Sequence, residues 1–99
     1  MAEDHRIRVQ ENAARIIGWL LEHRAEFEKD GVEESTLTGS VGLSEDEVRD
    51  AIDHLESHED VARVPEAAGN QPRFLLKPAR GWQEIAQSAG EEKHASRTV

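Results

Sequence analysis

Apolar residues recur every three or four positions along residues 9–27, with charged side chains between them. This spacing places the apolar side chains on one face of a helix and the charged ones on the other. Gly31 follows shortly after, and glycine commonly ends a helix because it adopts a positive φ without strain. The pattern predicts one long helix over residues 9–27, preceded by a flexible N-terminus over residues 1–8.

Two further helices are predicted in the middle of the chain. The first, over residues 33–41, has two apolar residues four positions apart, and its serine, threonine and glycine residues limit its length. The second runs from about residue 45 to residue 58 with its apolar residues on one face. Ser44 and Glu47 have the spacing of a capping box, in which each side chain bonds to the backbone amide of the other.

The hydrophobic period changes after residue 60. Short apolar runs at residues 61–64 and 73–76 predict two β-strands. The residues between them, 65–72, are rich in proline, glycine and asparagine, which favour a loop. A closing helix is predicted over residues 79–89, and residues 90–99 are expected to form a flexible polar tail.

The predicted core consists of the apolar residues on the inner faces of these elements. It comprises Ile16, Ile17, Leu20, Leu21, Leu37, Val41, Val48, Ile52, Leu55, Val64, Phe74, Leu76, Trp82 and Ile85. Trp19 and Trp82 lie on the apolar stripes of the first and last helices, so core packing explains both better than stacking on a ligand.

Composition limits the classes of function. The chain has 99 residues, enough for one domain, and no cysteine, which excludes a disulfide scaffold and a cysteine nucleophile. No run approaches the roughly 18 apolar residues of a membrane span, and no signal peptide is evident, so we expect a cytoplasmic protein without membrane contact. The net charge of −9 is unusual for a protein that binds phosphates. It fits either adaptation to a high-salt cytoplasm or a basic protein partner.

Two stretches carry a resemblance to a known family. Residues 37–44 (LTGSVGLS) look like the second helix, turn and third-helix start of winged helix-turn-helix domains, and residues 73–82 (RFLLKPARGW) resemble the last strand of the wing leading into the closing helix. The resemblance covers roughly residues 9–89. It implies an α+β winged helix-turn-helix fold with three core helices, a β-hairpin wing and a C-terminal closing helix. Glu59 and Asp60 depart from the family, which usually has a glycine and a large apolar residue there.

The resemblance implies a transcriptional regulator that binds double-stranded DNA, with the third helix in the major groove and the wing along the minor groove. Residues 44–58 hold six acidic residues and one arginine, a formal charge of −5, which disfavours contact led by the helix. Residues 61–80 hold four basic residues and one acidic residue, a formal charge of +3, which favours contact led by the wing. The candidate DNA-binding residues are Arg63, Arg73, Lys77 and Arg80 in the wing and Arg49 in the third helix. Alternatively, the wing cations are ordinary strand residues that are exposed to solvent and bind nothing.

A protein-interaction module is the alternative function. The outward face of the third helix carries Glu45, Asp46, Asp50, Asp53 and Glu56. Such an acidic face beside a basic hairpin suits charge-steered association, either with a basic partner as an adaptor or with a second copy as a homodimer. An acidic face that only keeps the protein in solution explains the same residues equally well.

Catalysis and metal binding find little support in the sequence. His54 and His58 are four residues apart, a spacing at which two imidazoles can share a metal, but no third ligand is evident nearby. Acidic pairs are frequent because acidic residues are frequent, and no glycine-rich phosphate loop follows a strand. We therefore expect no enzyme activity, no metal site and no cofactor.

Overall fold

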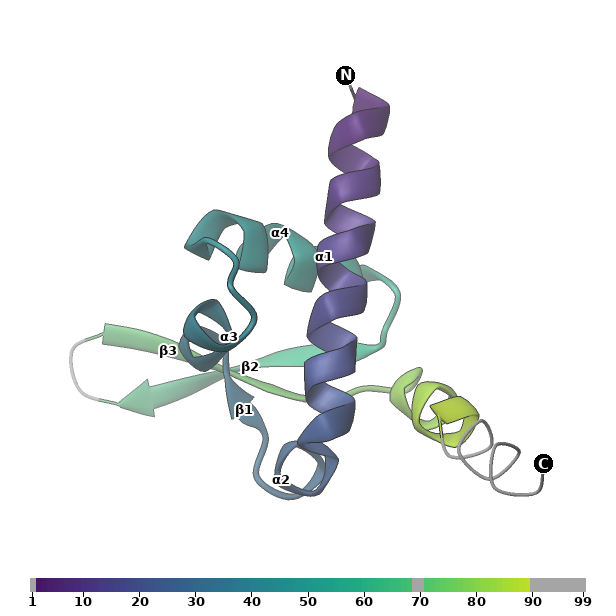
Figure 1. Cartoon of the computed structure of the whole chain (residues 1–99). Helices are drawn as coiled ribbons and strands as arrows, with labels where there is room; N and C mark the ends of the chain where they lie inside the picture. Colours follow the sequence, from purple (N-terminus) through teal and green to yellow (C-terminus); the bar gives the residue numbers. More distant parts are fainter. Residues whose placement is uncertain (1, 69–70, 90–99) are drawn as a thin grey trace.

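The computed structural model describes residues 2–68 and 71–89, and it has an α+β architecture (Figure 1). The helices are α1 (Ala2–Glu22), α2 (Arg24–Lys29), α3 (Glu34–Ser40) and α4 (Glu45–Ser57), followed by a last helix over residues 82–89. The strands are β1 (Val32–Glu33), β2 (Val61–Ala68) and β3 (Gln71–Pro78). They form one antiparallel sheet in the order β1-β3-β2. β3 is therefore the central strand, and it pairs with β2 on one side and with β1 on the other.

The β2–β3 hairpin is longer than the sequence predicts, because both strands continue through most of residues 65–72, which we expected to be a loop. Pro65 is accommodated because β2 is an edge strand, and Pro72 because β3 pairs with β1 only at residues 75–76. A proline on an unpaired edge removes no hydrogen bond from the ladder. The sequence does not predict β1, since two residues are too few to show an alternation.

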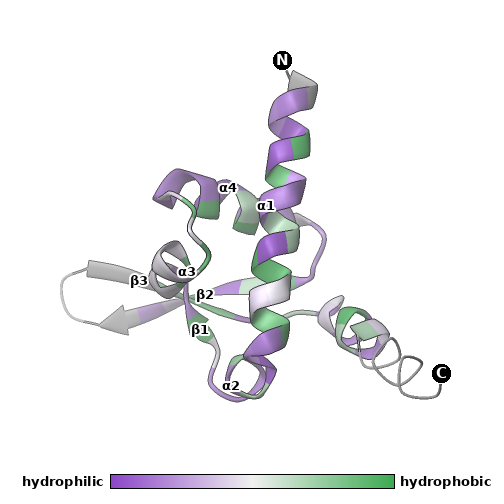
Figure 2. Ribbon diagram, viewed as in Figure 1, coloured by the Kyte–Doolittle hydropathy of each residue, from purple (hydrophilic) through white to green (hydrophobic). Residues whose placement is uncertain are grey.

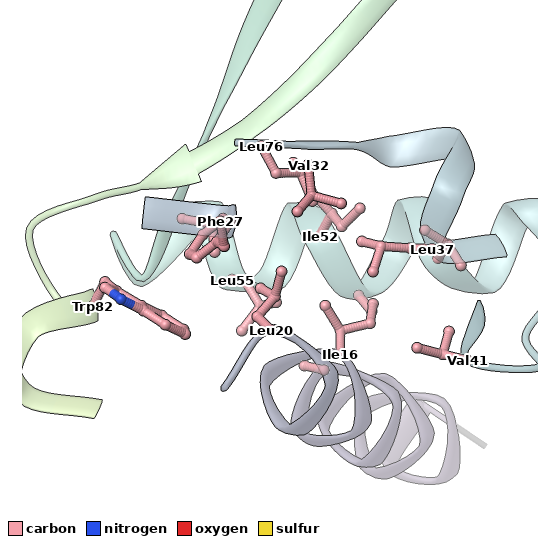
Figure 3. Packing of buried hydrophobic residues seen from close by; sticks show 14 of the residues in the cluster. Ile16, Leu20, Phe27, Val32, Leu37, Val41, Ile52, Leu55, Leu76 and Trp82 are labelled. Carbon is pink, nitrogen blue, oxygen red and sulfur yellow. The ribbon is translucent and has the colours of Figure 1, made fainter. Parts of the chain in front are cut away.

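The core lies between α1, α4 and the sheet (Figure 3). Buried as predicted are Ile16, Leu20, Leu37, Val41, Val48, Ile52, Leu55, Leu76 and Trp82. Ile17, Leu21 and Ile85, also predicted, are half-buried against them. Trp82 packs edge-on against Phe27 with ring centroids 4.7 Å apart, which fixes the last helix on α2.

The prediction that Val64 and Phe74 belong to the core is wrong, because their exposed fractions are 37% and 40%. Val64 is one residue away from Arg63 and therefore lies on the opposite face of the sheet from Leu76, which pairs with Arg63. Phe74 shares the face of Leu76 but lies farther along the hairpin, where the helices no longer cover the strands. Residue type identifies a strand, but the extent of the helical cover decides which half of it is buried.

The first predicted helix is two helices in the structure. α1 begins at Ala2, so residues 2–8 belong to the helix, and the predicted start at residue 9 is too late. His23 interrupts the helix with φ −113° and ψ 34°, and α2 follows at a changed direction (Figure 1). The His23 ring stacks on Trp19 at 3.9 Å and its Nδ1 lies 2.9 Å from the Trp19 carbonyl oxygen. These contacts hold the break in place.

The predicted start of α4 at Ser44 and the predicted helix end at Gly31, after α2, are confirmed. The Glu47 amide donates to Ser44 Oγ at 3.2 Å and the Ser44 amide donates to Glu47 Oε1 at 3.0 Å, which completes the capping box. The second of these bonds lowers the pKa of Glu47. Gly31 has φ 84° and ends α2 as expected.

Within the residues that the structure describes, no helix is long and apolar enough to cross a lipid bilayer. The predicted polar tail, residues 90–99, lies outside the described residues.

Candidate interaction site

A cleft of about 910 Å³ lies between α3, α4 and the hairpin. Four carboxylates line it, from Glu33, Glu34, Glu45 and Asp53, together with the guanidinium groups of Arg49 and Arg63 and the ring of Phe74. Four negative and two positive groups give the lining a formal charge of −2. Figure 2 shows the strongly hydrophilic outer turns of α4 beside the apolar residues that anchor the helix.

Arg63 is the centre of the ion-pair network in the cleft. Its Nε and Nη2 bond to the two carboxylate oxygens of Glu34, each at 3.2 Å, and its Nη1 lies 2.7 Å from Asp53 Oδ1 and 3.7 Å from Glu56 Oε1. The guanidinium also lies 5.9 Å from the centroid of the Phe74 ring. The side chain is only 16% exposed. Burial would lower the pKa of Arg63, but the hydrogen bonds that it donates to Asp53 and Glu34 outweigh burial and raise the pKa above its usual value.

The strand register explains why Arg63 lies there. Arg63 pairs with Leu76, and directly opposite residues of an antiparallel pair share a face of the sheet. Leu76 is fully buried beneath the helices, so Arg63 also faces them. A long cationic side chain on that face has to find carboxylates on the helices above it. The sequence predicts that Arg63 offers its charge to DNA. In the structure, however, three carboxylates already pair with its guanidinium group.

Lys77 and Arg80, two of the other predicted wing cations, do not join Arg63 on one surface. Lys77 pairs with Ala62, so it is exposed on the opposite face of the sheet. Arg80 is exposed in the turn before the last helix. Arg73 pairs with Glu66 in β3, and its side chain lies outside the described part of the chain. The alternation of the strands separates charges that are close in the sequence.

The predicted acidic residues of α4 divide between the cleft and the solvent. Glu45 and Asp53 line the cleft, and Glu56 reaches Arg63, whereas Asp46 and Asp50 are exposed. Asp46 accepts a bond of 3.5 Å from Arg49, the predicted DNA-contacting residue of this helix.

Sequence analysis misses the contribution of Glu33 and Glu34, which it takes only as the start of a short helix. Glu34 is 29 residues from Arg63 along the chain, and only the pairing of β1 with β3 brings the two together. The usable signal is the alternation Val61-Ala62-Arg63, which puts an arginine on the same face as a buried valine. An inward-facing arginine requires an acidic partner.

His54, in the last turn of α4, lies beside His58, which follows the end of the helix. The rings of His54 and His58 are 4.5 Å apart at 60°, in an edge-to-face arrangement. Among residues 2–68 and 71–89, no group of three or more histidine, aspartate or glutamate side chains could hold a metal ion.

Comparison of the chain with protein-family models, with curated proteins and with solved structures finds no match. Function is therefore inferred from the geometry and the charges of the site. The cleft offers carboxylates in excess of their cations and one exposed aromatic ring, which together suit a cationic ligand with a flat or aliphatic portion.

Proposed function

We propose that this chain is a winged helix-turn-helix domain that acts as a non-catalytic protein-interaction module, and that its acidic cleft binds a basic segment of a partner protein. The order of the elements supports the fold assignment. α3 and α4 are joined by a tight turn at Gly42, which has φ 72°, and the hairpin follows α4 directly. The sheet order β1-β3-β2 places the short strand before α3 on the far side of the hairpin.

The arrangement of charge in the cleft carries the functional proposal. In a winged helix that binds DNA, the third helix and the wing face phosphate groups. Here Glu45 and Asp53 occupy the space between α4 and the hairpin, and Arg63 is withdrawn among carboxylates. A phosphate placed there would meet like charges at short range, and a lysine or arginine side chain would meet opposite ones.

The preferred partner is an extended segment rich in arginine. Phe74 is 40% exposed at the edge of the cleft and offers a ring face to a guanidinium. The carboxylate of Glu45, which makes no ion pair within the described residues, can accept planar, bidentate hydrogen bonds, which a guanidinium supplies and an ammonium does not. The net charge of −9 would speed the encounter with such a segment and make binding weaken as salt rises.

The test is fluorescence anisotropy with a labelled peptide of alternating arginine and serine. We expect binding that weakens between about 50 mM and about 500 mM salt. Glu45→Lys/Asp46→Lys, which reverses two charges near the cleft, should reduce the affinity by roughly tenfold or more. The matched control, Glu22→Lys/Glu26→Lys, makes the same change in net charge on α1 and α2. Equal losses in the two variants would mean that only net charge attracts the peptide, and no binding at the lowest salt would refute the proposal.

DNA binding is the second candidate, favoured by the exposure of Lys77 and Arg80 at one end of the hairpin. The same anisotropy titration with a short mixed-sequence duplex tests it. DNA contact led by the hairpin predicts salt-sensitive binding that Lys77→Glu/Arg80→Glu abolishes and that Glu45→Lys/Asp46→Lys strengthens. The arginine peptide should respond to these two variants in the opposite sense.

A further inference from the structure

α1 has a second apolar stripe besides the one that faces the core. Ala13, Ile16 and Leu20 are buried where α1 packs on α4. A separate set of residues repeats with alternating steps of three and four, which is the spacing of heptad positions a and d. This set, the seam, consists of Ile7, Gln10, Ala14, Ile17 and Leu21.

The seam is open to solvent along much of its length. Ile7 is 52% exposed, more than Val64 or Phe74, and Ala14 is exposed as well. Ile17 and Leu21 are half-buried at the edge of the core. Figure 1 shows the N-terminal half of α1 projecting past the other helices and the sheet. A preformed helix therefore presents a coiled-coil pattern that its own domain covers only at Ile17 and Leu21 and leaves open towards the N-terminus.

We propose that the seam pairs in parallel with the seam of a second copy of this chain. Charge complementarity identifies the occupant and its direction. Arg6 and Glu11 flank the seam on opposite sides, at heptad positions g and e, five residues apart. In a parallel coiled coil, g of one helix faces e′ five residues later in the other, so each Arg6 would meet the partner copy's Glu11.

The same residues disfavour the antiparallel arrangement, in which g faces g′ and e faces e′. Arg6 would then lie along the partner copy's g edge, which includes Leu20. Glu11 would lie along its e edge, which includes Gly18, so neither charge would meet an opposite one. Within the described part of the chain, the side chains of Arg6 and Glu11 make no ion pair or hydrogen bond. They lie about 140° apart around the helix, so they cannot pair with each other in one copy.

Residues within and beside the seam suit a close and specific contact. Ala14 and Gly18 are exposed and small, which lets two helix backbones approach. Gln10 is a polar residue at a d position, and a polar residue within a seam fixes the register of the partner helix. The core contacts of α1 already order the helix, so dimerisation does not have to nucleate it. The seam shares no residue with the cleft, so the two surfaces act independently.

Disulfide trapping tests the contact directly, because the natural chain has no cysteine. Ile7→Cys and Ala14→Cys should each form disulfide-linked dimers under mild oxidation, since a parallel pair places each residue beside its own counterpart. His5→Cys is the matched control, because residue 5 is exposed on the opposite side of α1. Cross-linking of Ile7→Cys no faster than His5→Cys would overturn the proposal.

Charge reversal tests the direction of pairing, with sedimentation equilibrium as the readout. Arg6→Glu alone and Glu11→Arg alone should each weaken self-association by roughly tenfold, because both symmetry-related pairs become repulsive. An equimolar mixture of the two variants should restore the dimer as a heterodimer, in which every pair is again opposite in charge. Failure of the mixture to associate, or a natural chain that stays monomeric up to submillimolar concentration, would refute the parallel seam.

Discussion

The two halves of the β2–β3 hairpin have the same alternation of side chains and different surroundings. In the half next to α4, Val61 and Leu76 are buried and Arg63 is neutralised by carboxylates from α3 and α4. In the distal half, Phe74 is 40% exposed although it is apolar and shares the face of Leu76. The comparison shows that the helices, and not the strand sequence, decide which hairpin residues are structural.

The difference also redistributes the hairpin cations. Under the helices, an arginine becomes part of an ion-pair network and is unavailable to a ligand. On the opposite face, Lys77 remains exposed. The positive charge that the sequence assigns to one wing surface is therefore divided between an internal role and an external one.

The largest expected effect is the loss of an apolar contact in the covered half. Leu76→Ala should lower the free energy of unfolding by about 2–5 kcal/mol, because Leu76 is fully buried and the cavity would not collapse completely. Phe74→Ala, in the distal half, should cost less than about 1 kcal/mol. Urea denaturation followed by circular dichroism measures both, and similar losses would abolish the distinction between the halves.

Removal of the neutralised cation should have the next largest effect. Arg63→Met should lower the free energy of unfolding by about 1–3 kcal/mol, because Glu34 and Asp53 would keep their positions without a counter-charge. Lys77→Met is the control on the opposite face and should change stability by less than about 0.5 kcal/mol. Thermal unfolding at matched ionic strength compares the two. A smaller loss for Arg63 than for Lys77 would contradict an internal role for Arg63.

Glu59, between α4 and the covered half, should give an effect of opposite sign. It has φ 60°, a conformation that costs a residue with a Cβ atom about 1 kcal/mol relative to glycine. Glu59→Gly should therefore stabilise the fold by about 1 kcal/mol, measured as a higher urea midpoint with an unchanged slope. Gly81→Ala is the informative counterpart: its new Cβ would lie 2.6 Å from Asp60 Oδ1 and 3.1 Å from the Glu59 carbonyl, so it should destabilise the same junction.

Local signals in the sequence predict much of the fold. The capping box at Ser44 and Glu47 and the stop at Gly31 depend on neighbouring residues, and both are confirmed. The strand β1 depends on pairing with a distant part of the chain, and the break at His23 depends on a side-chain contact with Trp19 that the apolar pattern does not reveal. The sequence pattern also does not reveal that Phe74 is exposed, because its exposure depends on where the helices end above the sheet.

The candidate site is less predictable than the fold, because its residues come from three separate segments. The acidic side chains of α4 are recognisable from helical spacing alone. Their relation to Arg63 requires the register of β2 on β3, and the inclusion of Glu34 requires the pairing of β1. A charge count over residues 61–80 adds together side chains that the sheet places on opposite faces.

The smallest effect is expected beyond the covered end of the hairpin, where Trp82 holds the last helix. The Trp82 indole N–H donates to Glu28 Oε2 at 2.8 Å, and Arg24 Nε donates to the same oxygen at 2.7 Å. These bonds lower the pKa of Glu28, so its contribution to stability is fully present above the unfolded-state pKa and is lost as pH falls through the lower folded-state pKa. Glu28→Gln should therefore be less stable than the natural chain near about pH 6, and the difference should shrink towards about pH 3. Glu26→Gln is the matched control, because its carboxylate makes no hydrogen bond within the described residues. Urea midpoints measured across this range would contradict the role of Glu28 if the difference between Glu28→Gln and the natural chain were independent of pH.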